Sequence, residues 1–347
     1  MSDHRRPILA ITLGDPGGIG PEIAAKALAL KETYQVCRPL LIGTKGLVEM
    51  AIKISGLSGF EVKGLDHPGR GRYRFGTLEV MDLANFPIEE LKHKTVTKEQ
   101  GKASFEFVVK AIDLALAGQV DATVTGPINN SSINAAGFKY SGHTEIYAEK
   151  TGTRDYAMML ADGNFRVSHV STHLSLRQAC DRVKKERIGQ VIELTAQALV
   201  KMGIDEPKIA VAGLNPHCGE DGLFGYEEER EIKPAVVEAQ GRGLLVEGPI
   251  AADTVFSKAL GGQYHAVVVM YHDQGHIPAK LIGFKYDQNS MSWAQLAGVN
   301  LTLGLPIIRT SVDHGTAFGK AGEGRANPQS LIEAINLAAK LATRKSG

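Results

Sequence analysis

A chain of 347 residues with 22% charged and 43% hydrophobic residues has the composition of a soluble globular protein and the length of about two domains. The formal net charge of +1 supplies no long-range field to hold nucleic acid or an anionic membrane, although a local basic pocket for a small acid is compatible with it. Three cysteines without CxxC spacing argue against a disulfide framework, and there is neither a signal-peptide core nor an apolar run of roughly 20 residues. We therefore expect a cytoplasmic protein that binds neither nucleic acid nor a membrane.

The chain alternates between apolar, strand-like runs and helical segments, without an internal repeat. Such alternation is typical of βαβ units, so we predict an α/β fold with mainly parallel sheets. The main segments are strands at 8–13, 39–42 and 122–124 and helices at 22–30, 45–54, 103–116, 184–201, 226–240 and 328–342.

A glycine-rich loop, residues 14–20, lies between the first strand and the first helix. Backbone N–H groups at such a helix start attract phosphate or carboxylate, so Gly14 and Asp15 are candidate contacts for a cofactor. The loop is not the G-x-G-x-x-G dinucleotide fingerprint, because Asp15 and Pro16 interrupt the spacing. A tight turn without a ligand explains the glycines about as well.

Three strand-like runs end in loops that carry a histidine: His173, His217 and His272. Loops of this kind gather at the carboxyl ends of parallel strands, where three imidazoles could meet around one divalent metal. Zn²⁺ suits neutral imidazoles, but Mn²⁺, Co²⁺ or Mg²⁺ with further oxygen ligands remain open. Asp273 is a further ligand, an acceptor that orients an imidazole, or a capping residue. A single histidine here is usually structural, whereas three in equivalent places favour a metal site.

Two other segments carry candidate contacts for an anion. The segment 141–145 precedes a predicted helix, so His143 and Thr144 could place donors on an anion near the helix start, or simply cap it. Lys280 and Arg309 could together clamp a phosphate and a carboxylate, although each alone is more often a surface charge.

The segment 310–317 is dense in polar and small residues after another apolar run. Gly315 and Ala317 leave its backbone open to the close approach of a nucleotide. An ordinary turn before a helix is the alternative interpretation.

Seven motifs in this order closely resemble the 4-hydroxythreonine-4-phosphate dehydrogenase family, over essentially the full chain: GDPGGIGPEI, SGHTE, STHLSLR, LNPHCGE, GPIAADT, YHDQG and LGLPIIRTSVDHGTA. The resemblance implies a two-domain α/β/α fold similar to isocitrate and isopropylmalate dehydrogenases, with an interdomain active-site cleft. It also implies a homodimer with a shared active site, NAD as oxidant and one divalent metal per site. We expect a first domain at 1–140 plus 302–347, with the cofactor loop, and a second at 141–301, with the metal histidines and dimer contacts.

The resemblance also implies roles for individual residues. Lys280 is the candidate proton donor or acceptor, and Asp253 is a candidate acid, base or supporting carboxylate. The remaining positions carried over are His173, His217 and His272 for the metal, His143, Thr144, Lys280, Asn300 and Arg309 for the substrate, and Asp313, His314, Gly315 and Thr316 for the cofactor, which Gly14 and Asp15 would join.

Three departures bear on the substrate: extra residues between Lys280 and Asn300, His276 in place of an apolar residue, and the segment 319–324. They look more like the branch that oxidises 4-phospho-D-threonate or 4-phospho-D-erythronate to dihydroxyacetone phosphate. The alternative within the family is 4-phosphooxy-L-threonine, a precursor of pyridoxal phosphate (vitamin B6), and a more distant branch acts on aromatic cis-dihydrodiols.

The resemblance therefore implies a metal-dependent NAD oxidoreductase that acts on a CH–OH group. It oxidises the 3-hydroxyl of a 4-phosphorylated four-carbon hydroxy or amino acid, and decarboxylation follows. Two rival classes remain: a metal-dependent hydrolase or aldolase on a phosphorylated acid, and a metabolite-binding protein without catalysis. Binding of a nicotinamide cofactor would separate the first rival from a dehydrogenase.

Overall fold

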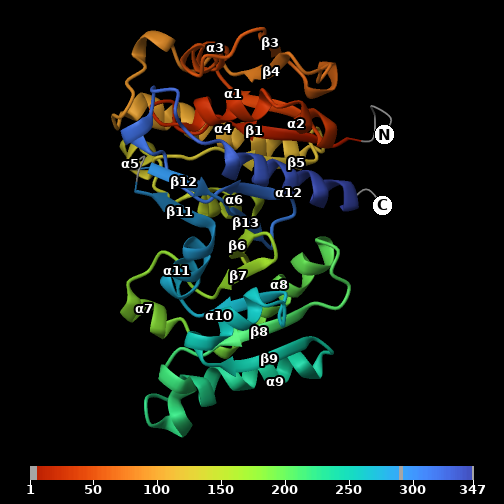
Figure 1. Ribbon diagram of the computed structural model, residues 1–347, viewed down its shortest axis with the longest axis vertical. Coiled ribbons are helices and arrows are strands. Elements are labelled where there is room, and N and C mark those ends of the chain that lie inside the picture. The colour runs from red at the N-terminus through yellow and green to blue at the C-terminus, as the bar shows by residue number, and fades with distance from the viewer. Residues whose placement is uncertain (1–5, 289–291, 346–347) are drawn as a thin grey trace. The chain divides into compact units, whose positions relative to one another are not determined.

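The computed structural model describes residues 6–288 and 292–345, and the chain divides into two compact units. Unit 1 comprises Met1–Arg154 and Leu305–Gly347, and unit 2 comprises Asp155–Gly304. Strands and helices alternate along the chain, and the strand pairing is mixed but mostly parallel (Figure 1). The predicted α/β fold class is confirmed.

The units divide later in the chain than the expected boundaries at 140/141 and 301/302. The helix α6 (His143–Thr151) consequently lies in unit 1. Its buried residues Ile146 and Tyr147 pack into the same apolar cluster as Phe105 of unit 1. Which core a helix joins depends on long-range packing, so the local sequence could not place this boundary.

The sheet of unit 1 is parallel, with strand order β3-β4-β2-β1-β5-β14. β1 and β5 are buried along their whole length, as expected for strands covered on both faces. The loops that carry the cofactor candidates start at the carboxyl ends of β1 and β14, the two strands that flank β5. The bounds are β1 (Ile8–Thr12), β2 (Arg38–Gly43), β3 (Glu61–Leu65), β4 (Thr77–Asp82), β5 (Ala122–Thr125), β14 (Arg309–Val312), α1 (Gly20–Leu28), α2 (Lys31–Val36), α3 (Lys45–Ile54), α4 (Lys98–Leu116), α5 (Asn130–Ala135) and α12 (Gln329–Lys345).

The sheet of unit 2 has the order β13-β6-β7-β10-β8-β9. β6 runs antiparallel to both neighbours, whereas β7, β10, β8 and β9 are parallel. The bounds are β6 (Ala157–Asp162), β7 (Phe165–His169), β8 (Lys208–Ala212), β9 (Leu245–Ile250), β10 (Ala266–Val269), β13 (Val299–Leu303), α7 (Leu176–Asp181), α8 (Lys185–Lys201), α9 (Lys233–Gly241), α10 (Ala252–Leu260) and α11 (His272–Gly283).

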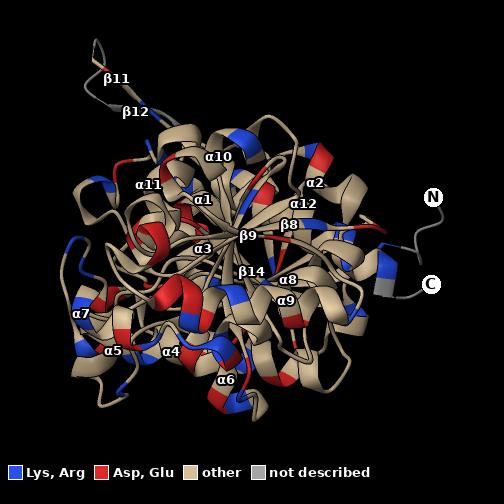
Figure 2. Ribbon diagram, turned by 90° about the horizontal axis from the view of Figure 1, so that it is seen from below, with Lys and Arg blue, Asp and Glu red and all other residues tan. Residues whose placement is uncertain are grey.

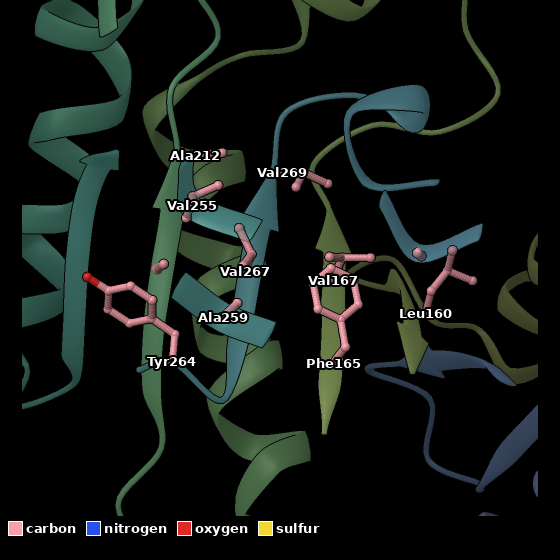
Figure 3. Close-up of a cluster of buried hydrophobic side chains, with 11 residues drawn as sticks. Leu160, Phe165, Val167, Ala212, Val255, Ala259, Tyr264, Val267 and Val269 are labelled. Carbon is pink, nitrogen blue, oxygen red and sulfur yellow. The ribbon is translucent and has the colours of Figure 1, made fainter. Parts of the chain in front are cut away.

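An apolar core holds the three central strands of unit 2 together. Figure 3 shows Val255 and Ala259 of α10 over Val267 of β10, with Val167 of β7 in the same cluster. These side chains are almost fully buried, and burying one aliphatic side chain stabilises a fold by about 1.5–3 kcal/mol. The core therefore fixes β7, β10 and β8 relative to one another, and with them the starting points of the loops at their carboxyl ends.

Acidic and basic residues are interspersed along the helices, as Figure 2 shows, in keeping with the small net charge. None of the helices in the described part of the chain is both long and apolar enough to cross a membrane.

The segment between Lys280 and Asn300, where we expected extra residues, contains an antiparallel hairpin of β11 (Phe284–Asp287) and β12 (Ser292–Leu296). Phe284 pairs with Leu296 at its base, and the Ala297 N–H donates to the Gly283 carbonyl at 3.0 Å. The segment is therefore a closed hairpin with its two ends held together.

Candidate active site

The three histidine strands lie side by side in unit 2. β10 pairs in parallel with β7 on one side and with β8 on the other. His173 follows β7, His217 follows β8, and His272 begins α11 directly after β10. The parallel alignment thus places all three histidines beyond the carboxyl ends of the strands, which is where ligands bind in α/β folds.

The donor set suits a divalent metal, and two of its members are already close. The ring centres of His173 and His272 are 6.0 Å apart. Two imidazoles on one tetrahedral ion need ring centres roughly 5 Å apart, given metal–nitrogen distances of about 2.0–2.1 Å. In residues 6–288 and 292–345, no three His, Cys, Asp or Glu side chains are gathered tightly enough to hold an ion. The donor chemistry of the three histidines fits a divalent metal, and binding of the ion would draw their side chains together.

The neighbours of His272 leave one of its ring nitrogens for a ligand. Asp273 Oδ1 lies 2.6 Å from His272 Nδ1, which places the imidazole proton on Nδ1 and the lone pair on Nε2. The ring of His276 stacks on His272 with centres 3.6 Å apart, and burial lowers the pKa of His276 to about 4. A neutral, stacked His276 thus fixes the plane of the His272 ring.

His217 opens a turn of left-handed backbone. Residues 217–221 all have φ between 42° and 79°, and only Gly219 among them adopts this conformation without cost. The buried carboxylate of Glu228 holds the segment just before it, accepting the Leu214 and Asn215 N–H groups at 2.7 Å each. An observed strain of this kind favours a functional role for the turn, since packing alone rarely maintains it.

Unit 1 contains a buried cation beside a neutral imidazole. Arg309 is 2% exposed, donates to Thr125 Oγ1 at 3.0 Å, and lies over the Tyr147 ring at 5.5 Å. Burial lowers the pKa of Arg309 to about 10, and burial together with the nearby guanidinium lowers the pKa of His143 well below its usual value. Arg309 keeps its charge at neutral pH, and Thr144 stands beside His143 in the first turn of α6. These groups suit an anionic ligand.

Protein contacts account for the glycines of the 14–20 loop. A Cβ on Gly14 would lie 2.3 Å from the Pro127 carbonyl oxygen, and one on Gly20 only 2.0 Å from that of Leu13. Asp15 is fully buried, and its Oδ1 accepts the Gly17 N–H at 2.8 Å. Burial raises the pKa of Asp15 to about 6. The structure thus supports the tight-turn interpretation, and the cofactor contacts of Gly14 and Asp15 stay a prediction.

The two cofactor candidates of unit 1 meet although they are far apart in sequence. The Ile19 N–H donates to the Thr316 carbonyl at 3.0 Å, and a Cβ on Gly18 would lie 2.9 Å from the Thr316 Cβ. The Asp313 N–H donates to Ser330 Oγ at 3.1 Å, which ties the loop to α12. The loop with Asp313, His314, Gly315 and Thr316 therefore packs against the glycine-rich turn.

The remaining candidates lie in unit 2. Lys280 on α11 is half-buried, with Nζ 5.2 Å from the centre of the Phe284 ring. Asn300 on β13 donates to Met158 Sδ at 3.0 Å, and its Oδ1 is buried without a hydrogen-bond partner in the described part of the protein. Asp253 is exposed in the first turn of α10. Burial, and then the charges of Glu228 and Asp253, raise the pKa of Cys218, the neighbour of His217.

Sequence reasoning missed three residues that shape these sites: Tyr147, Glu228 and Gln274. Each acts through a partner distant in sequence, so local periodicity carries no signal for it. Only for Gln274 did the sequence carry a signal, because this residue lies two positions after His272 in the YHDQG motif.

The parallel sheets, the polar loops at their carboxyl ends and the buried Arg309 together define an α/β enzyme that acts on an anionic small molecule. Its residues 35–338 match the family described as pyridoxal phosphate biosynthetic protein PdxA, and the chain belongs to this family of dehydrogenases. The predicted family resemblance is confirmed.

Three relatives cover nearly the whole chain. A protein of Symbiobacterium thermophilum named "Putative D-threonate 4-phosphate dehydrogenase" is 46% identical over 337 residues, 97% of each chain. A 4-hydroxythreonine-4-phosphate dehydrogenase from Klebsiella pneumoniae superposes with a TM-score of 0.84 at 40% identity, covering 97% of this chain and 99% of that one. A terephthalate 1,2-cis-dihydrodiol dehydrogenase from Burkholderia xenovorans follows with a TM-score of 0.65 at 30% identity, covering 96% and 98%.

Proposed function

We propose that this dehydrogenase oxidises the 3-hydroxyl of 4-phospho-D-threonate or 4-phospho-D-erythronate with NAD⁺, and that the product loses CO₂ to give dihydroxyacetone phosphate. The similarity to the Symbiobacterium protein, 46% identity across 97% of both chains, supports the D-acid. The observation that carries the proposal is the placement of His173, His217 and His272 beyond three adjacent strand ends of one sheet.

We assign a divalent metal, Zn²⁺ or else Mg²⁺, Mn²⁺ or Co²⁺, to His173, His217 and His272. When bound, the metal would act as a Lewis acid that lowers the pKa of the substrate hydroxyl and offsets negative charge during decarboxylation. Asp273 orients His272 for this role by fixing its tautomer.

The substrate contacts in this proposal are His143, Thr144 and Arg309 of unit 1 and Lys280 and Asn300 of unit 2. Arg309 supplies a permanent positive charge to an anionic group, and neutral His143 supplies a hydrogen bond. The unpartnered Oδ1 of Asn300 is an acceptor for a substrate hydroxyl. Lys280 is the candidate that exchanges the hydroxyl proton, and exposed Asp253 is the weaker one.

Membership of the family implies NAD or NADP as the oxidant, and we propose NAD. The loop with Asp313, His314, Gly315 and Thr316 is the proposed binding segment, supported from below by the glycine-rich turn. The reaction balances in two steps. NAD⁺ would take a hydride from C3 as a proton leaves the hydroxyl, and the resulting 3-keto acid would then break its C1–C2 bond to release CO₂. The enolate left at C2 would take up a proton to give dihydroxyacetone phosphate.

A homodimer is part of the proposal. Ile277 and Leu281 are one turn apart on α11 and are 66% and 80% exposed, so they offer an apolar strip suited to a second copy. Light scattering should give a mass about twice that of the 37.2 kDa chain. A monomer at micromolar concentration would contradict this assignment.

The deciding experiment follows NADH formation on 4-phospho-D-threonate, 4-phospho-D-erythronate and 4-phosphooxy-L-threonine, with added divalent metal and after chelation. Metal-dependent turnover of a D-acid supports the proposal. Preference for the L-amino acid would instead favour vitamin B6 synthesis, the second candidate, to which the similarity with the Klebsiella enzyme points. Turnover that survives complete chelation would overturn the metal role.

A further inference from the structure

A buried glutamine links two of the histidine loops. Gln274 is 7% exposed in the first turn of α11. Its Oε1 accepts the Met270 N–H at 2.7 Å, and its Nε2 donates to the Gly213 carbonyl, 61 residues away, at 2.7 Å. Met270 precedes His272, and Gly213 precedes His217. One side-chain amide therefore bonds the backbones that lead to both imidazoles.

This link lies where the sheet can no longer hold the two loops together. The register between β10 and β8 ends at Val268 opposite Val211. The Gly213 N–H already donates to Ile250 on the far side of β8, at 2.8 Å, so only its carbonyl is left to face the β10 loop. The Gln274 side chain bonds to this carbonyl. It thereby connects β8 and β10 beyond the last residues that pair through their backbones.

Ser171 ties the third loop to the same point. Its Oγ donates to the Met270 carbonyl at 2.9 Å, and it precedes His173 by two residues. Met270 is therefore bonded on its N–H side by Gln274 and on its carbonyl side by Ser171. The three histidine loops form one hydrogen-bonded unit with Met270 at its centre.

We infer that Gln274 is a positioning residue, which holds the His217 loop at the distance from His272 that lets His173, His217 and His272 converge on one divalent cation. The inference rests on the proposed metal role of these histidines. The amide meets both needs of the position, one acceptor for the Met270 N–H and one donor for the Gly213 carbonyl, and an ionised carboxylate supplies only acceptors. Glutamate has the same shape but would set an acceptor against the Gly213 carbonyl.

The test compares Gln274→Glu with Gln100→Glu, a matched change in unit 1. Gln100 is also buried, accepts the Lys92 N–H at 2.8 Å and donates to the Thr95 carbonyl at 2.8 Å. Each full-length variant is stripped by chelator and titrated with Co²⁺, by calorimetry and by visible absorption. Thermal unfolding of the apo proteins measures the structural cost of each change.

We expect Gln274→Glu to weaken Co²⁺ binding by about tenfold or more, the usual range for residues that orient metal ligands. Its Co²⁺ spectrum should move toward that of His217→Ala, whereas Gln100→Glu should keep the wild-type affinity and spectrum even if its melting temperature falls equally. A purely structural role for Gln274 would lower the melting temperature without altering the spectrum.

Two results would overturn the inference. Wild-type affinity and spectrum in Gln274→Glu would show that the link does not position His217. Absence of Co²⁺ binding by the wild type would remove the metal role itself, and the inference with it. If Gln274→Glu does not fold, Gln274→Met, which removes both hydrogen bonds without adding charge, takes its place with the same expected results.

Discussion

The glycine-rich turn of unit 1 and the histidine loops of unit 2 occupy the same place in their sheets, yet they are built in opposite ways. In the turn, neighbouring backbone and side-chain atoms fill the space that a Cβ on its glycines would need, and Asp15 is fully buried. In the histidine loops, the imidazoles of His173 and His217 are exposed, and side-chain hydrogen bonds to the backbone hold the loops. Close packing therefore determines the conformation of the turn, whereas side-chain hydrogen bonds determine that of the histidine loops.

The same kind of sequence motif, polar or small residues after a strand, can therefore reflect either close packing or ligand binding. A run of glycines at a helix start has two explanations, a bound ligand or close packing, and here Pro127, Leu13 and Thr316 occupy the space that added Cβ atoms would need. A histidine at a strand end predicts a ligand more strongly when its nitrogen faces solvent and its loop is anchored elsewhere. Substitutions in the two regions should accordingly change different observables.

The largest expected effect is on turnover in unit 2. His217→Ala should lower kcat/KM by about 1000-fold or more, because it removes one of three proposed ligands of the Lewis acid. The control is His265→Ala, whose ring accepts the Lys208 N–H at 2.9 Å near the opposite end of β10. Steady-state kinetics on the D-acids measures both, and the control should stay within about twofold of wild type. Equal losses in the two variants would contradict a metal role for His217.

Gly14→Ala should instead destabilise unit 1. The residue combines φ of +71° with a 2.3 Å clash against Pro127, so we expect a loss of about 3 kcal/mol in unfolding free energy. Gly56→Ala is the matched control, since Gly56 has φ of +64° but no neighbour within 4 Å. Chemical denaturation should show a loss of only about 1 kcal/mol there. Similar losses at both positions would mean that packing does not specify the turn.

Asp15 predicts how the stability of the turn depends on pH. Burial raises its folded-state pKa from 3.8 to about 6, so folding favours the protonated acid. Its stabilising effect is present below about pH 4, falls as the pH rises to about 6 and then levels off, a change of roughly 3 kcal/mol. Unfolding free energies of wild type minus Asp15→Asn, taken from pH 4 to 7, should decrease accordingly. A difference that stays flat or rises would contradict the expected effect of burying this carboxyl.

The smallest effect should come from a single link between histidine loops. Ser171→Ala removes the hydrogen bond to the Met270 carbonyl and should cost about 1 kcal/mol of stability, because it leaves a buried acceptor without that donor. Ser257→Ala, which removes an exposed bond to the Thr254 carbonyl on α10, should cost less than about 0.5 kcal/mol. Thermal unfolding with and without metal measures both variants. An equal loss of stability would mean that the Ser171 hydrogen bond stabilises the protein no more than an exposed one does.

The sequence predicted those parts of the protein that local patterns determine. Alternating segments predicted the α/β class, and the apolar runs before His173, His217 and His272 predicted the strands β7, β8 and β10. The contacts of Gln274 with Gly213 and of Ile19 with Thr316 join residues that are distant in the chain, so periodicity could not reveal them. The left-handed turn at 217–221 was equally hidden, because four of its residues are not glycine.

The hairpin between Lys280 and Asn300 lies between two proposed substrate contacts and is tied together where it begins and ends. Because Phe284 pairs with Leu296 and Gly283 bonds to Ala297, added residues lie beyond a closed base. The span from Lys280 to Asn300 is therefore set by the base of the hairpin and is independent of its length. A protein engineer could therefore change the sequence between β11 and β12 while the two ends of the hairpin keep their spacing.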